Sequence, residues 1–255
     1  MRKSVMITGA GAGIGRATAD VFAKAGWFVG AYDIDSAAVT SWASTQGPEH
    51  ACSGSLDVVD PQQWQQAIAD FTQAAGPLDV LVNNAGVLVD GAFADTDLAA
   101  QKHMIDINVV GVMNGCHAAK PALTASRGRV VNMSSASALF GQPSLAVYSA
   151  SKFAVRGLTE ALSVEWAADG ISVSDIMPLF VKTAMVANMR DVPATRRLGV
   201  RLSADDVAQV IFRAATTRSP RLHYAVGLQS KSLKQALRFS PDWLARFVNA
   251  RIGAH

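Results

Sequence analysis

Short β-branched runs alternate with longer helical patterns along the first 180 residues of this 255-residue chain. The strand patterns fall at residues 4–8, 27–33, 50–56, 78–83, 129–134 and 171–177, with a last one at 222–226. The helical patterns fall at residues 14–25, 36–45, 60–75, 97–125, 147–168 and 204–217. Such alternation is typical of βαβ units around a parallel sheet. We therefore predict a single-domain α/β fold, with a doubly wound parallel sheet and flanking helices.

The composition favours a globular protein without disulfides or metal. Half of the residues are hydrophobic, and the two cysteines, Cys52 and Cys116, form no disulfide framework and fit a reducing compartment. The histidines and cysteines show no metal-ligand spacing, so we expect no metal site. There is no signal-peptide pattern and no apolar run of about 18 residues. We therefore expect a cytoplasmic protein.

Charge is unevenly distributed along the chain. Residues 1–180 contain 10 Lys and Arg against 16 Asp and Glu, whereas residues 181–255 contain 13 against 4. The last quarter is therefore chemically distinct from the rest. We predict a main domain over residues 1–228, which includes an insertion-like loop at 179–202, and a basic tail over residues 229–255.

A glycine-rich turn, which contains Gly9, Gly11, Gly13 and Gly15, follows the first predicted strand. Glycines at such a turn let the backbone approach a phosphate group, and the helix that follows supplies free N–H groups. The spacing Gly-x3-Gly-x-Gly differs from G-x-G-x-x-G, and the turn lacks the Gly-Lys-Ser/Thr of a P-loop. A plain tight turn between strand and helix is the alternative.

Polar residues at the ends of later strands extend this candidate nucleotide site. Asp33 closes the second strand and can accept hydrogen bonds from both ribose hydroxyls, while its charge repels a 2′-phosphate. Asp57 ends the third strand and suits an adenine amino group, and Asn83–Gly86 ends the fourth. Each is also explained as an ordinary turn or N-cap residue, a role that Asp35 can fill beside Asp33.

Tyr148 and Lys152 stand four residues apart in a predicted helix, so their side chains share one face. Free tyrosine ionises at about pH 10, and a nearby positive charge lowers the pKa of a phenol toward neutral pH. The pair is therefore a candidate general acid or base. By itself, the same spacing is common on solvated helix surfaces.

The glycine turn, Asn83–Gly86, Ser135 thirteen residues before Tyr148, and Lys152 occur in the order and spacing of the short-chain dehydrogenase/reductase family. Over roughly residues 3–226 the chain resembles this family. The resemblance implies a Rossmann-type fold, a homo-dimer or homo-tetramer, and an NAD-dependent alcohol dehydrogenase or ketone reductase. The residues that it implies for NAD binding are Thr8, Gly9, Gly13, Ile14, Gly15, Asp33, Asp57, Val58, Asn84, Ala85, Gly86, Tyr148, Lys152 and Thr183.

The resemblance also implies catalytic and substrate-binding roles. Tyr148 exchanges the proton with the substrate oxygen, Lys152 lowers the pKa of Tyr148 and holds the nicotinamide ribose, and Ser135 hydrogen-bonds the substrate oxygen. Asn108 matches the family asparagine that positions a water in the proton relay. Alternatively, Ser135 satisfies a local backbone group and Asn108 kinks its helix.

One departure from the family pattern lies after the sixth strand. The family usually has Pro-Gly there, whereas this chain has Pro178 and Leu179, so a positive φ at residue 179 would be strained. The apolar stretch that follows at 184–189, together with Leu139, Phe140 and Leu145, predicts a small apolar substrate. The alternative is that these residues pack on the core.

Two other classes of function fit parts of the sequence. A catalytically idle NAD(H) sensor or interaction protein could use the same fold, although sensing needs no proton donor. A methyltransferase on a similar sheet would have no use for the Tyr/Lys pair. The basic tail lacks a groove-reading or stacking motif, so we expect no nucleic-acid partner.

The tail has two short amphipathic patterns, at 230–239 and 241–252, with Ser240 as N-cap and Pro241 at the first helical position. Their apolar stripes and basic flanks suit peripheral contact of residues 230–252 with an anionic membrane. The alternative, which we favour slightly, is that the stripes pack on a sister subunit or cover the active site.

Overall fold

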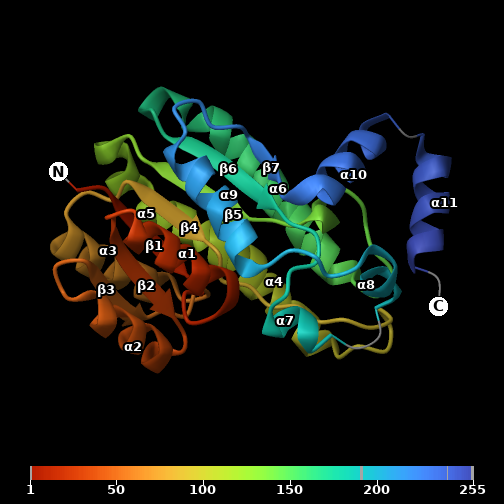
Figure 1. Cartoon of the computed structure of the whole chain (residues 1–255), viewed down its shortest axis with the longest axis horizontal. Helices are drawn as coiled ribbons and strands as arrows, with labels where there is room; N and C mark the ends of the chain where they lie inside the picture. The colour runs from red at the N-terminus through yellow and green to blue at the C-terminus, as the bar shows by residue number, and fades with distance from the viewer. Residues whose placement is uncertain (1, 190–191, 240, 254–255) are drawn as a thin grey trace.

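The computed structural model describes residues 2–189, 192–239 and 241–253, and these contain a seven-stranded sheet that is parallel throughout (Figure 1). The strands run β3-β2-β1-β4-β5-β6-β7 across the sheet. Their bounds are Ser4–Thr8 (β1), Phe28–Asp33 (β2), Ala51–Ser55 (β3), Val80–Asn83 (β4), Arg129–Met133 (β5), Ser172–Met177 (β6) and His223–Ala225 (β7). The predicted doubly wound fold is confirmed.

The strand order reverses beside β1. The chain proceeds from β1 outward to β2 and β3, and then returns to place β4 on the other side of β1. Every residue of β1 and of β4 is buried, as expected for central strands that helices cover on both faces. In open parallel sheets a crevice forms at this reversal, outside the carboxyl ends of the strands. The fold therefore predicts a ligand site next to Thr8 and Asn83.

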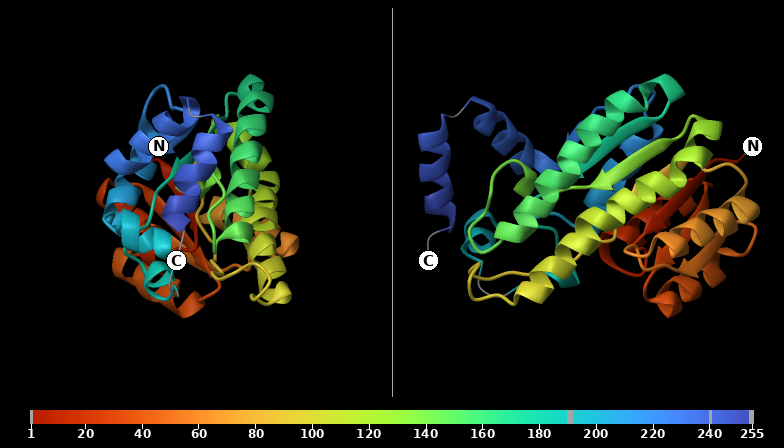
Figure 2. Two further views of the ribbon diagram at one scale, coloured as in Figure 1. Left: turned by 90° about the vertical axis from the view of Figure 1, so that its right-hand side faces the viewer. Right: turned by 180° about the vertical axis from the view of Figure 1, so that it is seen from behind.

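Helices cover both faces of the sheet and enclose two apolar cores. One core lies under α1 (Gly13–Lys24), α2 (Ser36–Gln46) and α9 (Ala204–Thr216). The other lies under α3 (Pro61–Ala75), α5 (Gly111–Ser126) and α6 (Ala146–Glu165), and Figure 2 shows this face from behind. The helix ends follow their sequence signals, because Asp60 caps α3 ahead of Pro61, and Ser203 forms a capping box with Asp206 at the start of α9.

The predicted continuous helix over 97–125 is interrupted. The structure has α4 at Leu98–Ile105, a π-helical segment at Asp106–Val110, and then α5. Asn108 lies in the middle of the π-helical segment, where its buried amide binds the backbone of Val87. Such bulges occur frequently at functional sites.

The loop after β6 and the tail extend beyond the sheet, whereas, of the elements between them, α9 packs on the sheet and β7 belongs to it (Figure 1). The loop at 179–202 contains α7 (Ala184–Ala187) and α8 (Pro193–Leu198), and the tail forms α10 (Gly227–Phe239) and α11 (Asp242–Gly253). Thus α10 begins three residues before the predicted start at 230, and α11 begins one residue after Pro241. The predicted N-cap, Ser240, lies outside the described residues. No described helix combines the length and apolar character that a membrane span requires.

A matched pair of glycine substitutions tests the contact between α1 and the first turn. A Cβ at Gly15 would lie 2.0 Å from the carbonyl oxygen of Gly9, whereas a Cβ at Gly157 in α6 would meet no atom within 4 Å. We expect Gly15→Ala to lower the free energy of unfolding by about 2 kcal/mol or more. We expect Gly157→Ala to raise it by up to about 1 kcal/mol, because alanine favours helix. Urea denaturation measures the free energy of unfolding of both variants. Equal effects of the two substitutions would contradict the close contact between α1 and the first turn.

Candidate active site

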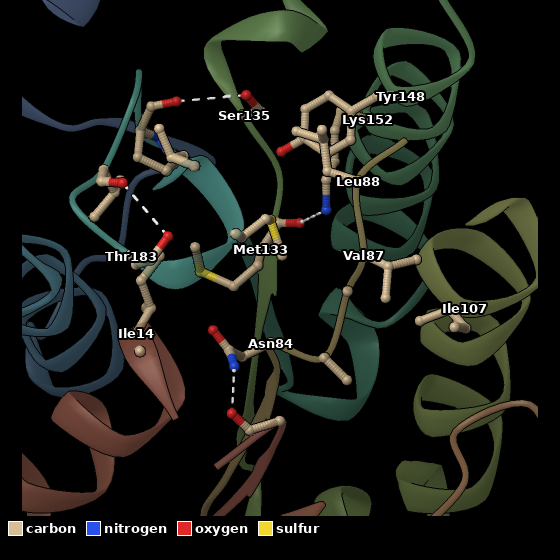
Figure 3. Close-up of a pocket in the computed structure, with 18 of the residues that line it drawn as sticks. Ile14, Asn84, Val87, Leu88, Ile107, Met133, Ser135, Tyr148, Lys152 and Thr183 are labelled. Atoms are coloured by element: carbon tan, nitrogen blue, oxygen red, sulfur yellow. Dashed lines mark hydrogen bonds between the residues drawn. The ribbon is translucent and has the colours of Figure 1, made fainter. Parts of the chain in front are cut away.

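A cavity of about 400 Å³ opens at the carboxyl ends of the strands, between α6 and the loop after β6 (Figure 3). Its lining comes from the ends of β1 to β5, from α6 and from that loop. The lining residues that the sequence predicted are Gly9, Gly13, Ile14, Asp33, Asp57, Val58, Asn84, Ala85, Gly86, Ser135, Tyr148, Lys152 and Thr183. The tertiary structure thus brings residues from most of the chain into one site.

The glycine turn forms the part of the cavity next to α1. Gly9 and Gly13 have φ angles of 65° and 53°, in the left-handed region that favours glycine. Ala12 is the N-cap of α1 and makes no side-chain cap, while Ala12, Gly13 and Ile14 all line the cavity. The first amides of α1 are therefore left for another acceptor. An uncapped helix N-terminus with an open glycine turn fits a dinucleotide pyrophosphate.

Thr8 and Gly15 flank the glycine turn, and neither of them lines the cavity. The Thr8 hydroxyl accepts hydrogen bonds from the backbone N–H groups of Asn84 and Ala85, both at 3.1 Å. The Asn84 side chain donates to the carbonyls of Thr8 and Gly9, at 2.9 and 3.1 Å. These bonds join the ends of β1 and β4, so Thr8 shapes the predicted site. Gly15 also shapes it, because the absence of a side chain lets α1 approach the carbonyl of Gly9.

Acidic side chains stand at the opposite end of the cavity from α6. The Asp33 carboxylate accepts from the backbone N–H groups of Gly11 and Asp35, at 2.8 and 3.0 Å, which fixes its direction. Asp57 is held similarly, by the N–H of Val59 at 3.0 Å. Arg16 lies nearby, but its guanidinium donates to backbone carbonyls, including that of Ala38 at 2.8 Å. Asp33 is thus oriented without an ion pair to a basic side chain among the described residues.

Tyr148 and Lys152 meet on one face of α6, as predicted (Figure 3). The Lys152 ammonium lies 5.6 Å from the centroid of the Tyr148 ring and donates to the carbonyl of Met133 at 2.9 Å. Burial lowers the pKa of Lys152 to about 8. Burial also raises the pKa of Tyr148, and a hydrogen bond with Ser135 offsets only part of this rise. The net rise has desolvation of the phenolate as its main cause, and the predicted lowering of the Tyr148 pKa by Lys152 stays a prediction.

Ser135 occupies the end of β5 and lines the cavity beside Tyr148. Its hydroxyl accepts from the N–H of Ser137 at 3.1 Å, so it also serves the local backbone role that the sequence left open. Ser134, its neighbour, instead donates to the carbonyl of Lys152 at 3.3 Å. The Ser135 hydroxyl donates to the Ser137 hydroxyl at 3.2 Å or to the Pro178 carbonyl at 3.5 Å, and among these serines it is the one that affects the pKa of Tyr148.

Asn108 stands behind the cavity. Its side chain is fully buried, accepts from the N–H of Val87 at 2.9 Å, and donates to the carbonyl of Val87 at 2.9 Å and to Ser151 at 3.3 Å. It therefore connects the segment after β4 to α6, and its predicted part in a water relay stays a prediction.

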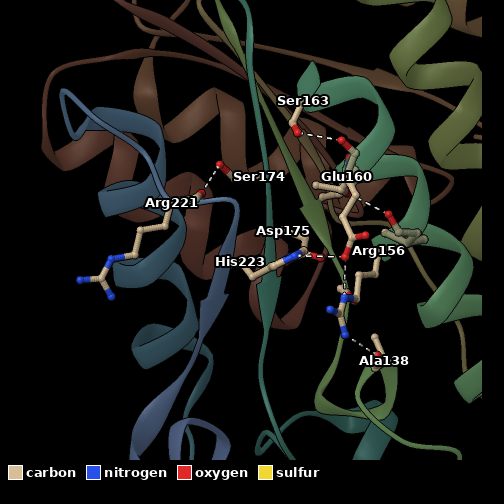
Figure 4. A network of polar contacts seen from close by, with 12 residues as sticks. Ala138, Arg156, Glu160, Ser163, Ser174, Asp175, Arg221 and His223 are labelled. Carbon is tan, nitrogen blue, oxygen red and sulfur yellow. Dashed lines mark hydrogen bonds and ion pairs between the residues drawn. The ribbon is translucent and has the colours of Figure 1, made fainter. Parts of the chain in front are cut away.

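A polar network, which the sequence analysis missed, supports the same helix (Figure 4). One turn beyond Lys152, Arg156 donates to the carbonyl of Ala138 at 3.3 Å and to Glu160 at 2.8 Å. Glu160 then meets one ring nitrogen of His223 at 3.2 Å. The other ring nitrogen lies 2.9 Å from the fully buried Asp175. The network links α6 to β6, β7 and the segment after Ser135; its signal in the sequence is the four-residue spacing of Arg156 and Glu160.

The loop after β6 closes the cavity without the strain that the sequence analysis considered. Among the described residues, the non-glycine positions with positive φ are Arg127 and Ser144, so Leu179 adopts an ordinary conformation. Thr183 lines the cavity, and its methyl group lies 3.5 Å from where a Cβ of Gly13 would stand.

The apolar side chains at the Tyr148 end of the cavity come mainly from the loop after β6, and one comes from Leu145, the N-cap of α6. They are Leu88, Leu145, Leu179, Phe180, Val181, Met185 and Val186. Leu139 and Phe140 do not line the cavity, so that part of the apolar prediction is wrong. The loop is itself covered, because α11 contacts α8, and Asn249 of α11 donates to the carbonyl of Gly141. These contacts fit a tail that covers the active site, and membrane contact stays a prediction.

Comparison with known proteins places the chain in a family. The family model described as short chain dehydrogenase matches residues 3–193. A trans-4-hydroxycyclohexanecarboxylate dehydrogenase from Sinomonas cyclohexanicum is 31% identical over 225 residues, which are 85% of this chain and 87% of that protein. The chain therefore belongs to the short-chain dehydrogenase/reductase family.

Other relatives and solved structures agree with this assignment. A 3-alpha-(or 20-beta)-hydroxysteroid dehydrogenase from Mycobacterium tuberculosis is 44% identical over 131 residues, so the match covers 51% of this chain and only half of that relative. A short-chain dehydrogenase from Streptomyces avermitilis has a TM-score of 0.84 at 28% identity, covering 100% of this chain and 99% of that one. A Burkholderia phymatum short-chain dehydrogenase/reductase in complex with NAD has a TM-score of 0.81 at 27% identity, covering 93% and 92%.

The burial of Lys152 gives a stability prediction. In the unfolded chain its ordinary pKa is 10.5, against about 8 in the folded protein, so at pH 7 folding must desolvate an ammonium group. We expect Lys152→Met to raise the free energy of unfolding by about 1–2 kcal/mol at pH 7, after the lost hydrogen bond to Met133 is subtracted.

The same variant tests the sign of the effect. Between pH 8 and pH 10.5 the unfolded chain binds the proton that folded Lys152 has lost, so wild-type stability rises with pH relative to the variant. Urea denaturation at pH 7, 9 and 10.5 should show the advantage of the variant shrink and then reverse, because the wild type gains about 3 kcal/mol over this range. A variant that is less stable than wild type at pH 7 would contradict the desolvation argument.

Proposed function

We propose that the protein is an NAD(H)-dependent oxidoreductase that interconverts an apolar secondary alcohol and its ketone, with Tyr148 as general acid/base. The observation that carries the proposal is a single cavity with Asp33 and the open N-terminus of α1 at one end and Ser135, Tyr148 and Lys152 at the other. The relatives named as dehydrogenases of hydroxysteroids and of a hydroxycyclohexanecarboxylate support this class of reaction.

The cavity fits a nicotinamide dinucleotide. The amides of α1 and the glycine turn would hold the pyrophosphate, Asp33 the adenosine ribose, Asp57 and Val58 the adenine, and Lys152 the nicotinamide ribose. When bound, this cofactor supplies or accepts the hydride. The Burkholderia phymatum structure in complex with NAD supports a nicotinamide cofactor, and the choice of NAD over NADP rests on Asp33.

Side chains of the protein donate and accept the proton in the proposed reaction. Because burial raises the pKa of Tyr148, its hydroxyl remains protonated at neutral pH and can donate to a carbonyl oxygen. Ser135 lines the same cavity as Tyr148 and would stabilise charge on the same substrate oxygen. Lys152 adds a buried positive charge beside the ring and thereby favours the phenolate that remains after proton donation.

An idle NAD(H)-binding sensor is the alternative. It would require the cofactor end of the cavity and no proton donor at the other end. The hydroxyls of Ser135 and Tyr148 at the other end of the cavity have no purpose in such a protein, whereas Lys152 would hold the nicotinamide ribose in either case. We therefore favour the enzyme.

Removal of one oxygen tests the catalytic assignment. Tyr148→Phe keeps the ring and removes the proton donor, so we expect turnover to fall by about 100-fold or more while NADH binding stays within a few-fold. The measurement is nicotinamide absorbance with secondary alcohols or ketones, alongside fluorescence titration with NADH. If the Tyr148→Phe enzyme keeps most of its activity, Tyr148 is not the general acid/base.

The cofactor preference follows from Asp33. Its oriented carboxylate should accept from ribose hydroxyls and repel a 2′-phosphate, so we expect NAD(H) to be preferred over NADP(H) by at least about tenfold in kcat/KM. Asp33→Ala should reduce this ratio. Asp57→Ala removes a carboxylate from the same cavity away from the ribose and should leave the ratio unchanged. Equal use of both cofactors by the wild type would refute the proposal.

A further inference from the structure

Helix α11 stands at one end of the molecule, and no described segment lies beyond it in Figure 1 or in the left panel of Figure 2. One side of the helix is attached to the protein. Leu244 and Asn249 are partly buried on this side, and Asn249 donates to the carbonyl of Gly141. Because α11 contacts the rest of the chain through α8 and Gly141, its opposite side faces outward.

Two large aromatic residues stand on the outward side of α11. Trp243 is 70% exposed and Phe247 is 54% exposed. They are four residues apart and therefore share one face of the helix. The other exposed side chains described on α11 continue the same stripe at spacings of three and four residues: Arg246, Ala250 and Arg251. This is the spacing of an amphipathic helix, but here the apolar stripe faces away from the core.

The outward stripe is apolar at its centre and positively charged at its edges. With about 3.6 residues per turn, Arg246 and Arg251 fall on either side of the two aromatic residues. The Arg251 guanidinium lies 5.0 Å from the centroid of the Phe247 ring. Among the described side chains, no carboxylate forms an ion pair with either arginine. An apolar patch that polar residues surround is typical of a site for a protein or a membrane.

The charge of the stripe favours a membrane over a second copy of the chain. Packing of this face on itself across a two-fold axis would bring the arginines of both copies together without a described acidic partner. Five residues are also few compared with the roughly 20 per side of a stable protein interface. Over residues 229–253 the tail contains five Lys and Arg against one Asp. An anionic lipid surface complements this charge, and it accepts aromatic rings at the level of its headgroups.

The contacts of α8 place this face next to the apolar end of the cavity. Ala194 of α8 packs in one apolar cluster with Leu145 and Phe180, and both of these line the cavity. A bilayer bound at α11 would therefore lie beside the part of the protein that forms the apolar wall. This location suits a substrate that partitions into lipid.

We propose that the outward face of α11 is a docking surface for an anionic lipid bilayer, in which Trp243 and Phe247 enter the interface while Arg246 and Arg251 pair with lipid phosphate groups. Helices that combine aromatic residues with flanking arginines bind in this way, with the helix axis in the plane of the interface. The proposed contact does not depend on the oxidoreductase function, and its test uses no substrate.

The test measures co-sedimentation of the full chain with vesicles of phosphatidylcholine, either alone or with about one third phosphatidylglycerol. We expect binding to the anionic vesicles only, with a marked decrease in about 0.5 M sodium chloride. Arg246→Gln/Arg251→Gln should weaken this binding by about tenfold or more, because each basic residue near an anionic surface adds to the attraction. Trp243→Ser/Phe247→Ser should weaken it to a similar extent, because it removes the apolar contact.

A charge-matched variant separates docking by α11 from attraction to net charge alone. Arg213→Gln/Arg218→Gln removes two charges from exposed positions in and after α9, and its binding should stay within about twofold of wild type. All of these substitutions are at exposed positions, so the midpoint of thermal unfolding should stay within about 2 °C of wild type.

Trp243 also reports where the helix lies. With brominated phosphatidylcholine in the anionic vesicles, we expect quenching of the wild-type tryptophan fluorescence. Trp243→Phe keeps an aromatic ring and should still bind, but most of the quenching should be lost. The reason is that the other four tryptophans belong to the two cores or pack against them.

Several results would overturn the proposal. One is a folded wild type that does not sediment with the anionic vesicles, and another is unchanged binding by both α11 double variants. Equal weakening in Arg213→Gln/Arg218→Gln would assign the binding to net charge, and quenching that persists in Trp243→Phe would assign it to another surface. If the wild type does not bind vesicles and the α11 double variants have a lower molar mass by light scattering, the face belongs to an interface between copies of the chain.

Discussion

The close approach of α1 to the ends of β1 and β4 is the constraint on which the rest of the site depends. Gly15 makes it possible, because any larger residue would overlap the carbonyl of Gly9. Thr8 and Asn84 then join the two strand ends by hydrogen bonds on both sides. This arrangement leaves the uncapped N-terminus of α1 at the point where the strand order reverses, which is where the proposed pyrophosphate site requires it.

The catalytic end depends on a different principle, the burial of charge. Lys152 is held at the carbonyl of Met133, on the same helix face as Tyr148, in surroundings that disfavour both the ammonium and the phenolate. The protein tolerates this cost because α6 is fixed along its length, by Asn108 at one side and by the network through Arg156 and Glu160 further on. A rigid helix keeps the phenol and the ammonium within reach of one substrate oxygen, which is what general acid catalysis requires.

The substrate end is built from parts that lie outside the sheet. Apolar side chains of the loop after β6 form most of its wall. Helix α11 contacts α8, and its Asn249 donates a hydrogen bond to the carbonyl of Gly141, so the tail packs against the loop after β6. The proposed cofactor site therefore lies at strand ends, and the proposed substrate site lies mainly on loops. Function in such folds varies through loops of this kind while the sheet stays the same.

Local signals in the sequence determined most of the fold and the chemical identity of the site. Alternating hydrophobic periods, caps such as Ser203 and Asp60, and the spacing of Ser135, Tyr148 and Lys152 are properties of neighbouring residues, so they are visible without coordinates. Only the tertiary structure decided the π-helical break at Asn108, the raised pKa of Tyr148, and the contacts by which Gly15 and Thr8 shape the glycine turn. The physical reason is that burial, hydrogen-bond satisfaction and desolvation depend on residues distant in the sequence, which meet only when the chain is folded.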